Sequence, residues 1–403
     1  MSGSENGLVE ASKRYLMNNY GSPLAAFVSG SGCVLVDEDG REVLDFLSGI
    51  AVCSLGHCHP AVTAAISEQA GKLVHTSNFF ANEHAPEVAR RIEELLALGE
   101  GRVFFGNSGA EANEAAIKLA RRFGGYSRRR ILALEGGFHG RTMGALSATG
   151  QPSKQRPFEP LVPGFVHLRP GDIGALEAEL AHGDVAAVML EIVQGEAGVV
   201  PVPDEFVLAA RELTTANGAL LIVDEVQTGF GRTGDWFAFQ RLGISPDMVT
   251  LAKAIASGFP VGALFARAEI AAAFQPGDHG TTYGGQALAM AAAKATIEAL
   301  IELDAPATAR AKGKRLTAAI ERLPGVAGVR GSGLLLGVEL EQPLARATQA
   351  AALEEGLIVN AIGDSVVRLA PPLVVSDEEM ERAVSKLGRA LTLARTASEG
   401  EAG

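Results

Sequence analysis

One lysine that follows an apolar stretch is a candidate for chemical reactivity. Lys253 comes after residues 248–251, which are typical of a short buried strand, and its immediate neighbours are apolar. Burial favours the neutral form of an amine, and a neutral amine is the form that condenses with an aldehyde. A lysine in such a segment can also extend to solvent, so this segment alone leaves both interpretations open.

Two carboxylates follow a second apolar stretch. Asp224 and Glu225 come directly after residues 220–223, which are Leu-Leu-Ile-Val. Burying acids at the end of a strand costs free energy unless a cationic partner is near. The pattern therefore predicts a cation at this edge of the sheet, although Asp224 also fits a simple N-cap for the next segment.

A turn of small residues precedes a predicted helix at residues 111–122. It follows the apolar residues 102–105 and includes Ser108, Gly109 and Ala110. The first N–H groups of a helix have no partner within the helix, and the helix dipole favours an anion there. A serine before a helix also serves as an ordinary cap, so phosphate binding is one of two interpretations.

The three segments together match one cofactor, pyridoxal 5′-phosphate. Its phosphate needs a helix start, its pyridinium nitrogen needs a carboxylate, and its aldehyde needs an amine. Ser108 with the two residues after it, Asp224 and Lys253 would supply these groups.

The elements that must position these segments alternate between strands and helices. This alternation predicts a large α/β domain with a mostly parallel sheet, whose carboxyl-end edge binds ligands. The predicted strands are residues 102–105, 131–134, 185–190, 219–223 and 248–251, and the predicted helices are residues 61–73, 83–97 and 111–122.

The two ends of the chain have a different pattern. A hairpin is expected over residues 32–46, strands at 333–340 and 366–370, and a capped helix after Ser376. We expect one smaller α+β domain built from both ends. The expected division is an N-terminal segment 1–59, a large domain 60–303 and a C-terminal part 304–403.

Charge and cysteine content limit the possible partners and compartment. The net charge of −12 opposes binding to nucleic acid, and the basic run 128–130 fits a solvated helix end. The start of the chain lacks the apolar core of a signal peptide, and no stretch is long enough to span a membrane. Three widely spaced cysteines, Cys33, Cys53 and Cys58, do not form a disulfide framework and indicate a reducing cytoplasm.

Six motifs in order resemble those of the class III aminotransferases, over essentially the whole chain. Within that class the sequence looks most like the acetylornithine aminotransferases. The motifs are residues 55–60 (LGHCHP), 108–114 (SGAEANE), 137–142 (GFHGRT), 224–229 (DEVQTG), 252–253 (AK) and 279–285 (HGTTYGG). The resemblance implies the aspartate-aminotransferase-like α/β fold, fold type I of the pyridoxal-phosphate enzymes.

The resemblance also implies a role for each cofactor-binding residue. Lys253 would hold the cofactor aldehyde as an imine and shuttle the proton during transfer. Thr282 would reach the phosphate of the neighbouring subunit, which makes the enzyme a homodimer with shared active sites. The remaining cofactor residues are Ser108, Gly109 and Ala110 at the phosphate, Phe138 stacked on the ring, Asp224 at the ring nitrogen and Gln227 at the ring hydroxyl.

Four residues are expected to bind substrate on the same grounds. Arg141 would hold the substrate carboxylate, with Thr281 close by. Arg368 would bind the α-carboxylate of 2-oxoglutarate, and Glu196 would mask it while an ω-amine enters. An ordinary ion pair between two domains is the alternative for Glu196 and Arg368.

The implied reaction moves the δ-amino group of N-acetylornithine to 2-oxoglutarate, a step of arginine biosynthesis. The alternative functions are an aminotransferase for ornithine, succinylornithine or 4-aminobutyrate, and a catalytically silent binding protein of the same fold. His139 argues against the ornithine enzymes, which tend to carry tryptophan there. Ile192, Ala81 and His84 depart from the residues usual in the family, which bears on the substrate.

Two other sites have weaker patterns. Cys53, His57, Cys58 and His59 resemble a zinc cluster, but no second ligand pair has the matching spacing, so no metal is expected. Gly136 and Gly137 suggest a nucleotide loop, but no dinucleotide fingerprint follows a strand there.

Overall fold

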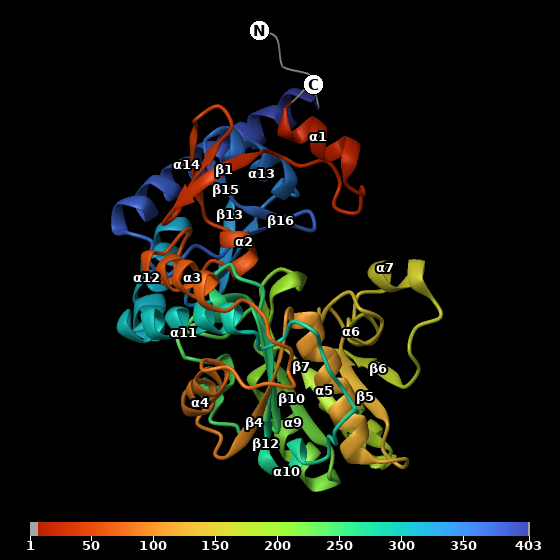
Figure 1. Cartoon of the computed structure of the whole chain (residues 1–403). Coiled ribbons are helices and arrows are strands. Elements are labelled where there is room, and N and C mark those ends of the chain that lie inside the picture. The colour runs from red at the N-terminus through yellow and green to blue at the C-terminus, as the bar shows by residue number, and fades with distance from the viewer. Residues whose placement is uncertain (1–6, 402–403) are drawn as a thin grey trace.

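The computed structural model describes residues 7–401. Its largest element is a seven-stranded sheet in the order β4-β12-β11-β10-β7-β5-β6 (Figure 1). All neighbouring strands are parallel except that β12 runs against both β4 and β11. The strands are β4 (Gly101–Gly106), β5 (Arg130–Leu134), β6 (Phe165–Leu168), β7 (Val185–Leu190), β10 (Leu220–Asp224), β11 (Met248–Leu251) and β12 (Gly262–Arg267).

Apolar side chains alternate between the two faces of this sheet, as they must when both faces are covered. In β5, Leu132 and Leu134 join one core, whereas Ile131 and Ala133 join the other. The second core includes α5, which packs on several central strands, while helices such as α9 cover the first. The large-domain helices are α3 (Pro60–Lys72), α4 (Ala85–Leu96), α5 (Gly109–Gly124), α6 (Met143–Ala148), α7 (Pro152–Gln155), α8 (Ile173–Ala181), α9 (Asp204–Asn217), α10 (Ala268–Ala271) and α11 (Ala287–Glu302).

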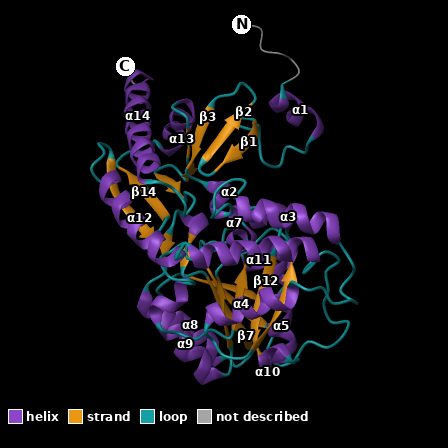
Figure 2. Cartoon of the chain, turned by 60° about the vertical axis from the view of Figure 1, so that its left-hand side comes forward, coloured by secondary structure: helices purple, strands orange, loops and turns teal. Residues whose placement is uncertain are grey.

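Two four-stranded sheets lie beside the large sheet and come from the two ends of the chain (Figures 1 and 2). The first joins both ends, because β15 pairs in parallel with β3. The second has the order β13-β14-β17-β16 and is antiparallel throughout. The strands are β1 (Phe27–Ser31), β2 (Val34–Asp37), β3 (Glu42–Asp45), β13 (Val326–Ser332), β14 (Leu335–Leu340), β15 (Leu357–Ile358), β16 (Asn360–Ile362) and β17 (Val366–Leu369).

The helix expected after Ser376 begins with a reciprocal cap. Ser376 Oγ accepts from the Glu379 N–H at 3.1 Å, and a Glu379 carboxylate oxygen accepts from the Ser376 N–H at 2.7 Å. The remaining α-helices are α1 (Leu8–Tyr15), α2 (Ser48–Ala51), α12 (Ala305–Ile320), α13 (Ala345–Glu354) and α14 (Asp377–Glu401). The short 3₁₀ turns are η1 (Arg156–Phe158), η2 (Gly195–Ala197), η3 (Ala238–Leu242) and η4 (Lys253–Ala256). A small hairpin consists of β8 (Val193–Gln194) and β9 (Val200–Pro201).

The expected large sheet is confirmed as mostly parallel, with the reversed β12 as an unexpected strand. The domain boundaries at residues 59/60 and 303/304 stay a prediction. Within residues 7–401, no helix is both long and apolar enough to cross a bilayer.

Candidate active site

Six strands of the large sheet bring their carboxyl ends to one edge. β4 is parallel to β11 because β12 runs against both, and β10, β7, β5 and β6 share that direction. A cavity of about 400 Å³ lies at this edge. Its lining includes Ser108, Gly109, Ala110, Asn113, Phe138, His139, Arg141, Glu191, Asp224, Val226, Gln227 and Lys253. Nearly all the predicted cofactor residues therefore meet in one place.

Lys253 begins η4 and is separated from the end of β11 by one residue, Ala252. Its φ of +48° lies in the left-handed region, which a residue with a side chain adopts at a cost in free energy. Burial lowers the pKa of its ammonium from 10.5 to about 8. Within residues 7–401 no hydrogen bond or ion pair engages its amine. The cavity thus contains an amine with a lowered pKa that no described residue engages.

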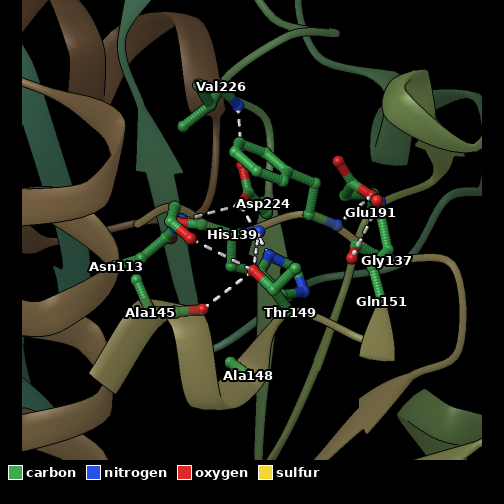
Figure 3. Close-up of polar contacts among 12 residues, drawn as sticks. Asn113, Gly137, His139, Ala145, Ala148, Thr149, Gln151, Glu191, Asp224 and Val226 are labelled. Atoms are coloured by element: carbon green, nitrogen blue, oxygen red, sulfur yellow. Dashed lines mark hydrogen bonds and ion pairs between the residues drawn. The ribbon is translucent and has the colours of Figure 1, made fainter. Parts of the chain in front are cut away.

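Asp224 ends β10 and is 3% exposed. One carboxylate oxygen, Oδ2, accepts from Asn113 Nδ2 and from His139 Nδ1, each at 2.8 Å (Figure 3). The other oxygen accepts from the Val226 N–H at 3.0 Å. Three hydrogen bonds fix the plane of this carboxylate, and Asn113 also donates to the His139 carbonyl at 2.7 Å.

The start of α5 has the geometry of an anion site. Ser108 Oγ accepts from the Glu111 N–H at 3.2 Å, as a cap does. No described residue accepts from the N–H of Gly109 or Ala110, which both line the cavity. A Cβ on Gly109 would lie 2.8 Å from a methyl carbon of Val226, so only glycine allows this close approach. Ser108 therefore caps the helix, and phosphate binding by the next two N–H groups stays a prediction.

This donor set fits pyridoxal phosphate. A free amine, a fixed carboxylate and free helix N–H groups face the same cavity, and Gly109 keeps space that a side chain would fill. These are the three groups that the cofactor requires.

Glu191 is a buried acid that the sequence interpretation missed. It follows β7, lines the cavity and accepts from the Phe138 N–H at 3.3 Å (Figure 3). Burial, and then the charge of Asp224, raises its pKa well above the usual range of a carboxyl group. The signal that identified Asp224, an acid directly after an apolar strand, was also present here.

Phe138 lines the cavity, and two cations lie near its ring. Arg141 Cζ is 5.6 Å from the centre of its ring, and Lys154 Nζ is 5.5 Å from it. Both distances are within the range of cation–π interactions. Stacking of Phe138 on the cofactor ring stays a prediction.

Arg368 on β17 meets Glu196 on η2. Arg368 is 1% exposed, and one of its nitrogens lies 2.5 Å from a Glu196 carboxylate oxygen. Burial opposes the charge of Glu196, but the Arg368 guanidinium prevails and keeps the pKa of that carboxyl below its usual value. Arg368 also donates to Asn360 Oδ1 at 2.8 Å and to Gln227 Oε1 at 3.3 Å. Gln227 thereby links the pair to the cavity, and no described residue accepts a hydrogen bond from its amide N–H₂.

Thr281 and Thr282 do not line this cavity. They lie in a separate groove of about 770 Å³, together with Phe79 and Phe80. Thr281 remains close to the cavity, since Asn107 Nδ2 donates to its hydroxyl at 3.2 Å. Thr282 of this chain is therefore not part of the cavity where the other predicted cofactor residues meet.

The Cys53–His59 segment shows no metal-site arrangement. His57 Nε2 pairs with Asp45 at 2.8 Å, and this hydrogen bond, followed by one to Cys53, raises the pKa of the imidazole to about 10. Within residues 7–401 no group of three or more suitable ligands gathers. All three cysteines are free thiols.

The fold and the cavity agree with the comparisons to known proteins. The family model for aminotransferase class III matches residues 15–391. The chain belongs to the class III aminotransferase family, and the expected fold class is confirmed.

Three relatives show how far the similarity extends. The acetylornithine aminotransferase of Mycolicibacterium smegmatis is 48% identical over 381 residues, covering 94% of this chain and 96% of the relative. The N-acetylornithine aminotransferase structure from Stenotrophomonas maltophilia is 36% identical with a TM-score of 0.83, covering 97% of this chain and 100% of that one. The ornithine aminotransferase structure from Toxoplasma gondii, which has partial occupancy of PLP at its active site, is 32% identical with a TM-score of 0.90, covering 96% and 94%.

Proposed function

We propose that this enzyme transfers the δ-amino group of N-acetylornithine to 2-oxoglutarate, giving N-acetylglutamate semialdehyde and glutamate. The observation that carries the proposal is the unengaged amine of Lys253 in one cavity with the fixed carboxylate of Asp224. The higher identity to acetylornithine aminotransferases than to an ornithine aminotransferase supports the choice of donor.

Pyridoxal phosphate would be held by the residues that face the cavity. The N–H groups of Gly109 and Ala110 would bind its phosphate, Asp224 its ring nitrogen and Gln227 its ring hydroxyl. The chemistry that the bound cofactor supplies is withdrawal of electrons from the carbon that carries the amino group.

The chain itself supplies proton transfer and orientation. The Lys253 Nζ accepts a proton when neutral and returns it when charged, and burial brings its pKa close to the working pH for this task. Asn113 and His139 hold Asp224 in one orientation, and its negative charge would stabilise the protonated ring nitrogen of the bound cofactor.

The ion pair of Glu196 and Arg368 would let one site accept two substrates with different charge requirements. The α-carboxylate of an amino acid would be drawn to a bare Arg368, and its δ-amine would then be misplaced. The paired Glu196 hides that charge until the oxoacid arrives. The short distance between the two charges and the burial of Arg368 support this gate.

Replacing Glu196 with alanine should raise α-transamination of glutamate relative to δ-transamination of acetylornithine. Replacing Arg368 with alanine should instead slow the 2-oxoglutarate half-reaction by about tenfold or more, as expected for loss of a charge-assisted hydrogen bond. Single-turnover absorbance measurements separate the two halves. Equal damage to both halves by both substitutions would leave only an ordinary ion pair.

The enzyme should be a homodimer in which Thr282 completes the partner's active site. Its place in a groove outside its own cavity, beside the exposed side chains of Phe79 and Phe80, supports this arrangement. Sedimentation at working concentration should show no substantial monomer. A fully active monomer would exclude the shared site.

The donor is tested by steady-state assays of acetylornithine against ornithine, succinylornithine and 4-aminobutyrate. Acetylornithine should have the highest kcat/KM with 2-oxoglutarate as acceptor. A higher value for another donor would reassign the substrate while leaving the class of reaction intact. We also propose a cytoplasmic location, in line with the three free thiols.

A further inference from the structure

The short helix α2 is a single left-handed turn. All four of its residues have a positive φ, at +47°, +65°, +67° and +60° for residues 48–51. Gly49 adopts this conformation without strain, but Ser48, Ile50 and Ala51 carry a Cβ, which lies too close to the following carbonyl oxygen. Residues with a side chain enter this region singly rather than in succession. Contacts outside the turn must therefore offset its cost in free energy.

Asp45 is the residue that binds the start of the turn. One carboxylate oxygen, Oδ1, accepts from the Leu47 N–H at 2.9 Å and from the Ser48 N–H at 2.7 Å. The Ser48 hydroxyl also donates to the carbonyl of Ala370, in the C-terminal part of the chain, at 2.5 Å. Asp45 is 2% exposed, so its carboxylate needs a counter-charge of its own.

His57 supplies that counter-charge. Its Nε2 lies 2.8 Å from the other carboxylate oxygen of Asp45, Oδ2. The bond to Asp45, and then one to Cys53, raises the pKa of the imidazole to about 10, so the ring is charged at neutral pH. The backbone of His57 is fixed as well, because its N–H donates to the Gly32 carbonyl at 2.8 Å and its carbonyl accepts from the Gly32 N–H at 3.0 Å. A fixed imidazolium therefore orients the carboxylate that binds the turn.

The turn leads directly into a wall of the candidate active site. Val52 follows the turn and lines the cavity. The Val52 N–H donates to the Ser48 carbonyl at 2.9 Å, so the first residue of the turn is bonded to the residue at the wall. Figures 1 and 2 show α2 between the sheet of β1, β2 and β3 and helix α3. A rearrangement of the turn would therefore move this part of the wall.

We propose that His57 is a positioning residue: through Asp45 it holds the left-handed turn of α2 and thereby fixes Val52 at the cavity wall. The inference rests on the proposed function, because it takes the cavity to be the place where the amino donor binds. Without the imidazolium, Asp45 would be a buried carboxylate with no paired charge, and the turn would lose a contact that offsets its strain. The turn would then relax, and Val52 would leave its place at the wall.

Three substitutions in the holoenzyme test the role of His57. His57→Ala removes the bond to Asp45, so the KM of acetylornithine should rise about tenfold while kcat changes far less. His57→Gln keeps an N–H donor in place of Nε2 and should stay within about threefold of the wild type. His59→Ala is the matched control and should leave KM unchanged. It removes an imidazole from the same loop, and within residues 7–401 the His59 Nδ1 has no hydrogen-bond partner.

A second substitution in the turn distinguishes positioning from a plain loss of stability. Ala51→Gly removes the Cβ from a left-handed residue and so lowers the strain that the Asp45 contact must offset. Combined with His57→Ala, it should bring the KM of acetylornithine back to within about threefold of the wild type. A KM that stays as high as in His57→Ala alone would contradict the role of the turn.

Amide hydrogen exchange of the peptide 46–53, measured in the holoenzyme without substrate, gives a readout independent of turnover. Exchange should be about tenfold faster in His57→Ala than in the wild type or in His59→Ala. Unchanged exchange in His57→Ala would overturn the proposal, and so would faster exchange or a lower melting temperature with an unchanged KM, which indicates a purely structural role. If the wild type fails to use acetylornithine, the proposed donor is wrong. The exchange measurement still decides whether His57 holds the turn, and KM is then compared with the donor that the enzyme prefers.

Discussion

The Asp224→Asn variant should retain its cofactor yet turn over roughly a thousandfold more slowly, an effect comparable to loss of a preorganised electrostatic contact in other active sites. Asparagine has nearly the same shape, so the cavity and the contact with Asn113 can persist. The negative charge is lost, however, and with it the stabilisation of a protonated ring nitrogen, which matters most when charge develops during transfer. Cofactor content from the absorbance of alkali-released pyridoxal phosphate, together with single-turnover rates, measures both effects.

Glu225 provides the matched control for Asp224. It is equally buried, but its carboxylate bonds to the Thr228 hydroxyl and to the Phe239 N–H, and it does not line the cavity. Burial raises its pKa to about 7. Glu225→Gln should therefore keep turnover within a few-fold of the wild type, a change small beside that of Asp224→Asn. Near-normal turnover in Asp224→Asn would mean that a different group holds the ring nitrogen.

Replacing Lys253 with alanine should have the largest effect, a loss of about ten-thousandfold or more in turnover, because one side chain both holds the cofactor and moves the proton. The phosphate and ring contacts come from other residues, so the variant should still bind pyridoxal phosphate, although reversibly on dialysis. Adding a small primary amine should restore part of the activity, since it replaces the missing base. Turnover above one hundredth of the wild-type value without added amine would contradict this role for Lys253.

The pKa of Lys253 also predicts a pH dependence in the apoenzyme. Burial lowers this pKa to about 8, so the neutral amine increases as pH rises through that value. The rate of combination with pyridoxal phosphate should rise with pH and level off above about 8. With an ordinary exposed lysine, the rate would continue to rise until the pH approached 10.5, which is the usual pKa of a lysine ammonium.

Residues that follow a strand could be located from the sequence alone. Lys253, Asp224 and Ser108 each come after a short apolar run, and parallel strands bring their carboxyl ends to one edge. That reasoning needs no knowledge of the strand order. It applied equally to Glu191 after β7, which was overlooked although the same signal was present.

Other parts of the site depend on contacts that no local pattern predicts. Asn113 lies in the second turn of α5 and reaches Asp224 only because that helix packs on the sheet beside β10. Lys154 on α7 lies against Phe138 because its ammonium donates to the Gln151 side chain, which in turn donates to the Gly136 carbonyl. The reversed β12 was also missed, because an apolar run shows neither its direction nor its neighbours.

The central claim is that Lys253 holds the cofactor, and borohydride reduction tests it most directly. The yellow holoenzyme is reduced to fix the pyridoxyl group on its amine, digested, and mapped by mass spectrometry. The account predicts that the label lies on Lys253, in the peptide that follows β11, and that Lys253→Ala carries none. A pyridoxyl group on any other lysine of the wild type would contradict it.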